Sequence, residues 1–181
     1  MTAEEPKSEP LIGSDLILLL IAAPDPNGEV EGRLFGITRL EKLLFIAERE
    51  GLLLEPVPDR FTFSAYHYGP YSKDVYEAVD LLEEIGLLRE ERVAMSGLDE
   101  MEELETDVAQ GEGVERRFFL TLTGAAVAGA VSRSHPKVAD ALAQVRQKYG
   151  SLPLNQLLAH VYRTYPDMVG RSRIKDQILG I

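Results

Sequence analysis

The segment FTFSAYHYGPYSKDVYEAVDLLEEIGLL, residues 61–88, constrains the fold of this chain more than any other part. Its first six residues alternate between apolar and polar or partly polar side chains, the period-2 pattern of a half-buried strand. A Tyr-Gly-Pro-Tyr turn follows at 68–71, and Ser72 is well suited to cap a helix that Gly86 ends. One face of this helix is apolar and predicts its buried side, formed by Val75, Ala78, Val79, Leu82 and Ile85. Residues 61–88 therefore predict a strand–turn–helix unit.

Further elements are predicted on both sides of this unit. Residues 36–50 form a leucine-rich helix, in which one apolar stripe consists of Leu40, Leu43, Leu44 and Ala47. Leu87 and Leu88 begin a second strand, and Arg116–Thr121 is its predicted returning partner. The segment 96–113 between these two strands is rich in acidic residues and glycine, and it is predicted to form a long mobile hairpin loop. This order predicts an α+β, mostly helical fold, with a winged-helix-like domain that has a small β-hairpin wing.

The chain is expected to divide into three parts. Residues 1–13 contain proline and glycine and predict a flexible leader. Residues 14–130 make up the winged-helix-like domain, whose first helix Ser14 or Asp15 can cap. Residues 131–181 form a helical C-terminal extension with one helix over Pro136–Tyr149 and another after Ser151. The apolar stripes of this extension are expected to pack on the domain or on a second chain, which makes a homodimer the expected state.

Composition points to a cytoplasmic protein. The 181 residues include no cysteine, which fits a reducing compartment. The longest apolar run, Leu16–Ala23, is far shorter than the roughly 20 residues of a membrane-spanning helix. The residues before it are too acidic for the start of a signal peptide.

The net charge of −11 is unevenly distributed, because residues 131–181 hold eight Lys and Arg against three Asp and Glu. An acidic surface repels polyphosphate, so nucleic acid would have to contact basic residues of the wing or the C-terminal third. The candidate nucleic-acid contacts are Arg116, Arg117, Arg133, Lys137, Arg171, Arg173 and Lys175. Ordinary solvated surface is the alternative interpretation of the same residues.

The helix after the turn carries mainly negative charge outside its apolar face. Such a helix would be repelled by phosphates, whereas a basic protein partner would be attracted to it. The predicted partner-binding face of this helix consists of Glu77, Asp80 and Glu84.

The aromatic turn consists of Tyr66, Tyr68, Gly69, Pro70 and Tyr71, and it permits two interpretations. In the structural one, the glycine supplies an unusual φ, the proline rigidity, and the tyrosine rings pack while their hydroxyls find partners. In the functional one, the rings form an aromatic rim for a partner peptide or an unstacked base.

No catalytic residue, metal site or cofactor site is predicted. The histidines at 67, 135 and 160 lack metal-ligand spacing. Neither a GxSxG nucleophile elbow nor a phosphate-binding glycine loop is present in the sequence. We therefore expect a protein that is not an enzyme.

Two segments together carry a family resemblance. RLEKLLFIA at Arg39–Ala47 and YHYGPYSKDVYEAV at Tyr66–Val79 resemble the paired motifs of the YwgA-like family of uncharacterised bacterial and archaeal proteins. More distantly, they are similar to the Panacea domain of SocA-like antitoxins, which is winged-helix-like. Tyr149–Met168 also resembles the C-terminal part of the YwgA-like group. The resemblance covers roughly residues 33–90 and 148–178, and it implies a partner-binding module without catalytic residues.

Two functions follow as expectations. The first is a non-enzymatic protein-interaction module, adaptor- or antitoxin-like, that binds a protein partner with a basic surface. The alternative is a winged-helix DNA-binding transcriptional regulator that uses a basic wing and C-terminal tail.

Overall fold

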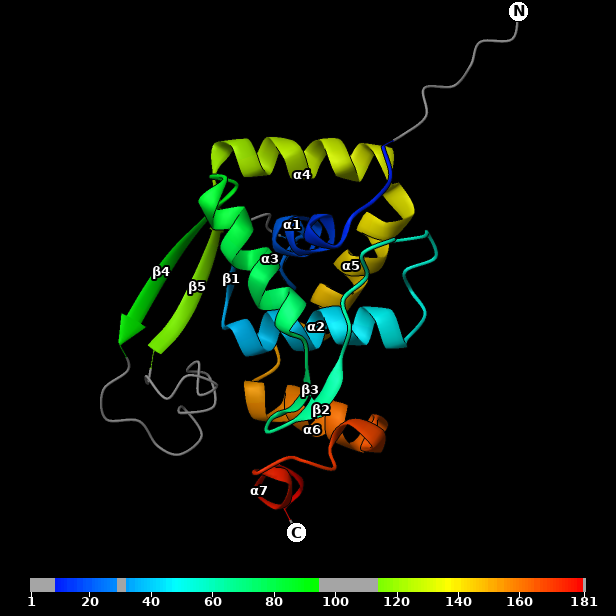
Figure 1. Ribbon diagram of the computed structural model, residues 1–181, viewed down its shortest axis with the longest axis vertical. Helices are drawn as coiled ribbons and strands as arrows, with labels where there is room; N and C mark the ends of the chain where they lie inside the picture. Colours follow the sequence, from blue (N-terminus) through cyan, green and yellow to red (C-terminus); the bar gives the residue numbers. More distant parts are fainter. Residues whose placement is uncertain (1–8, 29–31, 95–113, 181) are drawn as a thin grey trace, which may run out of the picture.

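The computed structural model describes residues 9–28, 32–94 and 114–180, and over these ranges the chain has the predicted α+β, mostly helical fold (Figure 1). The predicted loop at 96–113 lies outside them, as do the first eight residues of the predicted leader. In chain order the elements are α1 Gly13–Ala22, β1 Arg33–Phe35, α2 Ile37–Arg49, β2 Ser64–Tyr66, β3 Gly69–Tyr71, α3 Lys73–Glu84, β4 Leu88–Ala94, β5 Val114–Leu120, α4 Leu122–Ser134, α5 Pro136–Tyr149, α6 Leu154–Thr164, a 3₁₀ turn Pro166–Met168 and α7 Lys175–Leu179.

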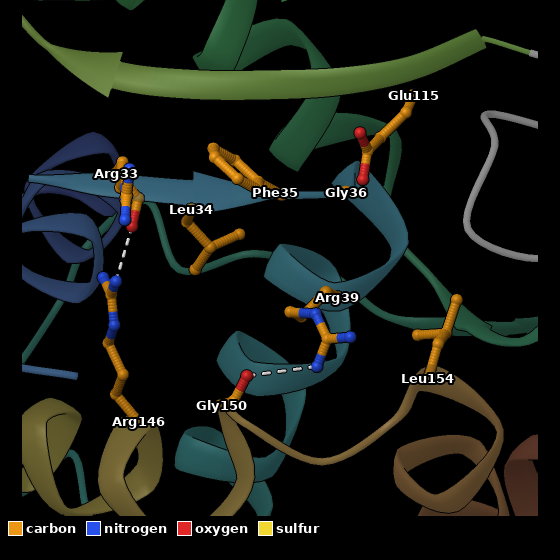
Figure 2. Close-up of a pocket in the computed structure, with 9 residues that line it drawn as sticks. All are labelled: Arg33, Leu34, Phe35, Gly36, Arg39, Glu115, Arg146, Gly150 and Leu154. Atoms are coloured by element: carbon orange, nitrogen blue, oxygen red, sulfur yellow. Dashed lines mark hydrogen bonds between the residues drawn. The ribbon is translucent and has the colours of Figure 1, made fainter. Parts of the chain in front are cut away.

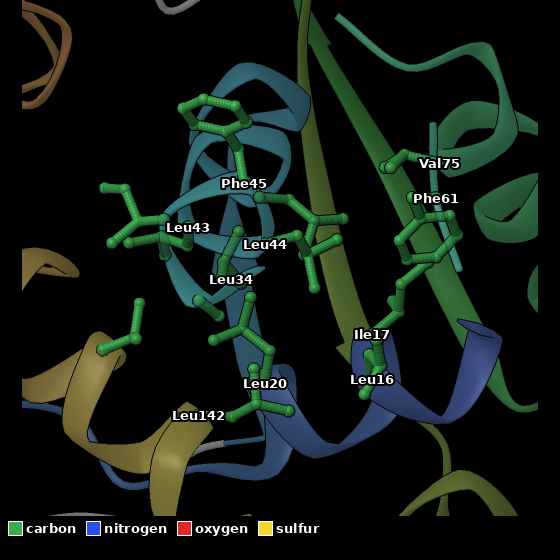
Figure 3. Packing of buried hydrophobic residues seen from close by; sticks show 14 of the residues in the cluster. Leu16, Ile17, Leu20, Leu34, Leu43, Leu44, Phe45, Phe61, Val75 and Leu142 are labelled. Atoms are coloured by element: carbon green, nitrogen blue, oxygen red, sulfur yellow. The ribbon is translucent and has the colours of Figure 1, made fainter. Parts of the chain in front are cut away.

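Helix α2 lies at the centre of the molecule, where it contacts α1, α5, α6 and strands from both sheets. In Figure 3, Leu44 of α2 lies nearer to Leu20 of α1, whereas the ring of Phe45 points away from α1, and all three belong to one buried cluster. The predicted apolar stripe is buried, but so are all residues from Leu40 to Ala47, including Glu41 and Lys42. The prediction of one buried stripe on α2 was therefore too narrow, because other helices and strands cover the helix on every side between Leu40 and Ala47.

Two small antiparallel sheets accompany the helices. The strand order of the first is β1–β5–β4, and Leu88 of β4 lies opposite Leu120 of β5. This confirms the predicted β-hairpin. Strand β1 was not predicted, since three residues are too few to show a period. Among the described residues, strands β2 and β3 pair only with each other, so the aromatic turn forms a separate hairpin.

The C-terminal helices complete the core of the same chain. Helix α5 has the predicted bounds, and the predicted stripe of α6, Leu154, Leu157, Leu158, Val161 and Tyr162, is buried. Helix α5 contacts α1 and α2, helix α6 contacts α2, and their apolar side chains belong to one continuous cluster with the N-terminal helices. Because this packing covers the stripes within one chain, they give no evidence for a second one, and the homodimer stays a prediction.

Three expectations, one about the leader and two about the ends of helices, were wrong. Residues 9–12 are not a loose leader, because Leu11 is only 1% exposed and α1 already begins at Gly13. Asp15 does not stand at the N-cap but accepts a hydrogen bond from the backbone N–H of Ile12 (3.0 Å). Ile85 is 57% exposed, because α3 ends at Glu84 and Ile85 lies beyond the last turn that packs on the core.

None of the helices in the described ranges has the length and apolarity needed to cross a lipid bilayer.

His135 is buried where α4 meets α5 and connects three distant segments. Its Nδ1 lies 2.5 Å from Oε2 of Glu55, and its Nε2 lies 3.1 Å from the carbonyl oxygen of Glu9. The hydrogen bond to Glu55 is the main reason why the pKa of His135 is raised, and burial opposes it.

Stability is expected to fall as the pH rises through this raised pKa. The folded state favours charged His135, so its contribution is fully present below the ordinary pKa of histidine, about 6.5, and is lost above the raised one. Thermal unfolding should show a lower Tm at about pH 8 than at about pH 6. Glu55→Gln should flatten this difference, and an equal difference in the variant would contradict the assignment to His135.

Candidate partner-binding surface

A buried ion pair attaches the aromatic turn to the central helix. The Nζ of Lys42 donates to Oε2 of Glu41 (2.6 Å) and to the carbonyl oxygen of Pro70 (2.6 Å). The other carboxylate oxygen of Glu41 accepts the backbone N–H of Ser72 (2.7 Å). These bonds join the helix segment 39–47 to the turn-and-helix segment 66–79, although their partners lie about 30 residues apart in the chain. The turn is therefore fixed by charged groups of the core and not by its own residues alone.

The turn also packs closely on the C-terminal helices. Gly69 has φ +85°, and a Cβ atom built on it would lie 2.7 Å from Cε1 of Tyr162 in α6. The Tyr162 hydroxyl accepts a hydrogen bond from Ser172 (3.0 Å), and burial raises the pKa of Tyr162 to about 12. The backbone N–H of Arg173 donates to the carbonyl of His67 (3.0 Å). Only glycine fits this close approach, which is consistent with the structural interpretation of the turn at Gly69.

Ser72 stands at the N-cap position of α3, as predicted, but its side chain makes no capping bond. Its hydroxyl is buried and has no hydrogen-bond partner among the described residues. The backbone of Ser72 fixes the start of α3 instead, because its N–H donates to Glu41 (2.7 Å) and its carbonyl oxygen accepts from the N–H of Val75 (3.3 Å).

Four aromatic rings form a continuous row from the hairpin onto α3. The ring of His67 stacks on Tyr66 at a centroid distance of 4.1 Å, Tyr66 lies 5.1 Å from Tyr71, and Tyr71 lies 5.4 Å from Tyr76. Tyr66 is 39% exposed and the other three rings are partly exposed. The remaining predicted turn residues face inward, since Gly69 and Pro70 are buried and Tyr68 packs against the core.

The row of rings ends beside the acidic positions of α3. Asp80 and Glu84 follow Tyr76 one and two helical turns later, and Glu77 lies one turn before Asp80 on the adjoining side of the same helix. Glu77 and Glu84 are exposed, and Glu77 forms an ion pair with Lys73 one turn earlier (2.5 Å). Asp80 is also exposed, but it contacts Arg116 of β5 (3.0 Å). We call the set Tyr66, His67, Tyr71, Tyr76, Glu77 and Glu84 the aromatic–acidic surface.

The β4–β5 hairpin, which was predicted as a basic wing, has nearly balanced charge in its described part. It contains four arginines and three glutamates, and each arginine contacts a glutamate. Arg116 is only 5% exposed and donates to both Glu90 (2.7 Å) and Asp80 (3.0 Å). Burial alone would raise the pKa of Glu90, but hydrogen bonds from Arg116 and Arg92 outweigh it and hold that pKa below its ordinary value.

The predicted nucleic-acid contacts are therefore placed unequally. Arg116 is engaged inside the protein, and the partly buried Arg117 contacts Glu115 (2.5 Å) and the face of Phe35. The remaining predicted contacts are exposed and lie at the junction of α4 with α5 or near the C-terminus: Arg133, Lys137, Arg171, Arg173 and Lys175.

Sequence reasoning did not single out Tyr76, Glu41 or Lys42. Tyr76 falls at helical spacing from Lys73 and Asp80, so the period of α3 could have joined the aromatic turn to the acidic face.

Within the described ranges, no group of three or more His, Cys, Asp or Glu is arranged to hold a metal ion. No protein-family model, curated protein or solved structure matches this chain.

Proposed function

We propose that this protein is a non-enzymatic protein-interaction module, adaptor- or antitoxin-like, that binds a basic segment of a partner protein. The observation that carries the proposal is the continuity of the aromatic–acidic surface, in which stacked rings lead directly onto exposed carboxylates. Aromatic faces attract guanidinium and ammonium groups, and the carboxylates add charge complementarity. Aromatic rings held in place at low entropic cost are typical centres of protein interfaces.

We further propose that the chain from α1 to β5 belongs to the winged-helix class, with the helices from α4 onward as a helical extension. The predicted bounds of 14–130 and 131–181 need this adjustment, because residue 14 lies inside α1 (Gly13–Ala22) and the boundary at 130 lies inside α4 (Leu122–Ser134). The order α1–β1–α2–α3–β4–β5, interrupted by the β2–β3 hairpin between α2 and α3, and the strand order β1–β5–β4 support this assignment. Helix α3 then occupies the position of a DNA-reading helix, but its exposed face carries carboxylates. A fold does not determine a function, and the charge on this helix favours a basic protein over phosphates.

A DNA-binding transcriptional regulator is the second candidate. The observation in its favour is the exposed basic run near the C-terminus, with Arg171, Arg173 and Lys175 at alternate positions. The balanced charge of the wing removes part of the cationic surface that this function would need.

The proposal is tested by selecting peptides from a random display library against the immobilised protein. We expect enrichment of peptides rich in arginine, and the double variant Glu77→Lys/Glu84→Lys should bind them about tenfold or more weakly. Asp80 is left intact because it contacts the buried Arg116.

The matched control is Asp140→Lys/Asp176→Lys, which changes the net charge equally at exposed positions of α5 and α7. Enrichment without basic residues, or equal binding by both double variants, would contradict the proposal. Binding of duplex DNA that weakens steeply with salt and is lost in Arg171→Gln/Arg173→Gln would support the second candidate instead.

A further inference from the structure

A pocket of about 440 Å³ lies between the end of α2, the residues that lead into β2 and the 3₁₀ turn. It shares no residue with the aromatic–acidic surface. The side chains that the following argument uses are those of Phe45, Glu48, Arg60, Phe61 and Phe63.

Three phenylalanine rings form the apolar wall of this pocket. Phe45 of α2 and Phe61 are buried, and Phe63 is partly exposed. The rings of Phe45 and Phe63 meet edge to face, with their centroids 5.3 Å apart and their planes at 71°. Rings fixed in this way offer a rigid surface to an apolar group, and their faces also attract cations. One cation already uses this attraction, since the guanidinium of Arg49 lies 5.4 Å from the centroid of Phe45.

Two opposite charges line the pocket beside the rings. Glu48 belongs to the last turn of α2, and Arg60 directly precedes Phe61. The two attract each other, but no ion pair joins them in the described part of the chain. The second arginine of the pocket, Arg49, pairs with Asp167, which lies outside the lining. The pocket thus presents one acid and one base at separate positions.

The carboxylate of Glu48 has lost part of its hydration, and no described residue donates a hydrogen bond to it. Burial is the largest influence on the pKa of Glu48, which is raised above its ordinary value although Arg60 and Arg49 lower it. A partly desolvated carboxylate without a donor carries a cost in free energy. A ligand that supplies an N–H donor at this position removes that cost.

The polar groups of the pocket in Figure 2 have a structural role instead. Arg146 of α5 donates to the carbonyl oxygens of Leu20 and Ile21 in α1 (2.7 Å each). Arg39 of α2 donates to the carbonyl oxygen of Gly150, the bond drawn as a dashed line in Figure 2 (3.1 Å). These bonds are explained by the packing of α5 on α1 and α2, so a ligand is better sought in the pocket at the end of α2.

We propose that the pocket at the end of α2 binds a free amino acid with an apolar side chain. The ammonium group of the ligand contacts Glu48, its carboxylate pairs with Arg60, and its side chain packs against the phenylalanine rings. A zwitterion matches the two separate charges, since the arginines repel a simple cation and Glu48 repels a simple anion. The pocket has roughly the volume of 15 water molecules in the liquid, which is enough for one amino acid. This inference is independent of the proposed partner recognition.

Isothermal titration calorimetry on the full chain tests the proposal with probes that share a phenyl group. Phenylalanine carries both charges, phenethylamine only the ammonium group and 3-phenylpropionate only the carboxylate. We expect saturable binding of phenylalanine, with each of the other two about tenfold or more weaker. Leucine tests whether an aliphatic side chain serves as well. Absence of saturable binding by both phenylalanine and leucine at concentrations up to about 10 mM would overturn the proposal, as would equal affinity for the three phenyl probes.

Variants assign each charged group of the ligand to its partner. Glu48→Gln should weaken phenylalanine binding about tenfold or more and should remove the preference for phenylalanine over 3-phenylpropionate. Arg60→Gln should weaken it similarly and should remove the preference for phenylalanine over phenethylamine. Circular dichroism checks that both variants are folded.

The matched controls are Glu83→Gln and Arg163→Gln, which make the same charge changes at exposed positions of α3 and α6. Both controls should bind phenylalanine as the native chain does. Unchanged preferences in Glu48→Gln and Arg60→Gln, or equal losses in these variants and their controls, would overturn the assignment to this pocket.

Discussion

Replacing Lys42 with methionine is expected to lower the free energy of unfolding by about 3–5 kcal/mol, although methionine has nearly the same length and shape. The side chains of Lys42 and Glu41 are both buried, and their contact distance is 2.6 Å. The substitution removes the cation beside a buried carboxylate and also the donor to the carbonyl of Pro70. Breaking one half of a buried pair is costly, because the carboxylate of Glu41 stays out of water after it has lost the cation beside it.

The matched control is Lys73→Met. Lys73 also forms an ion pair with a glutamate, but this pair is exposed on α3, so its loss should leave stability essentially unchanged. The paired replacement Glu41→Gln/Lys42→Met should recover most of the stability that Lys42→Met loses, since it removes both charges together. Urea denaturation measures all three variants. Equal midpoints for Lys42→Met and Lys73→Met would contradict the role given to the buried pair.

The contrast between Lys42 and Lys73 shows that sequence patterns did not predict which charged side chains are buried. Periodicity placed Lys42 and Glu41 beside the apolar stripe of α2, where charged side chains usually face water. Their burial results from contacts with a hairpin that follows about 30 residues later and with helices from the C-terminal third. Local spacing contains no information about such contacts. In the structure, Glu41 and Lys42 join residues 39–47 to residues 66–79.

The bounds of α5, the buried stripe of α6 and the β4–β5 hairpin were predictable for a different reason. Each has a strong local signal, such as Pro136 at the first turn of α5 or the stripe from Leu154 to Tyr162. The candidate surface was predictable in its two halves, the aromatic turn and the acidic face. Their junction at Tyr76 depends on how the hairpin packs against α3, which is a tertiary contact.

The ion pairs of the arginines in the β4–β5 hairpin could not be predicted from the sequence either. RRFF at 116–119 looks basic when it is taken alone. Pairing β5 with β4 brings Glu90 beside Arg116, and the packing of α3 adds Asp80. The positive charge predicted for the wing is thus balanced by carboxylates that lie 26 and 36 residues earlier in the chain.

Gly69→Ala is expected to destabilise the protein through two separate effects. A positive φ disfavours any residue with a Cβ atom by about 1–2 kcal/mol. The new methyl group would also lie 2.7 Å from the buried ring of Tyr162, and overpacking of this kind costs about 1–3 kcal/mol more. Because β3 would have to move away from α6, the row formed by Tyr66, Tyr71 and Tyr76 should be disturbed as well, and binding of basic peptides should weaken.

The control for Gly69→Ala is Gly86→Ala, which separates the two effects. Gly86 also has a positive φ, +75°, but a Cβ atom there would meet nothing within 4 Å. Gly86→Ala should therefore show only the backbone cost of about 1–2 kcal/mol and should bind basic peptides normally. Urea denaturation and titration with a selected peptide compare the two variants. Equal losses of stability in both would mean that contact with Tyr162 does not constrain the turn, and the aromatic row would then have to be held by the buried ion pair alone.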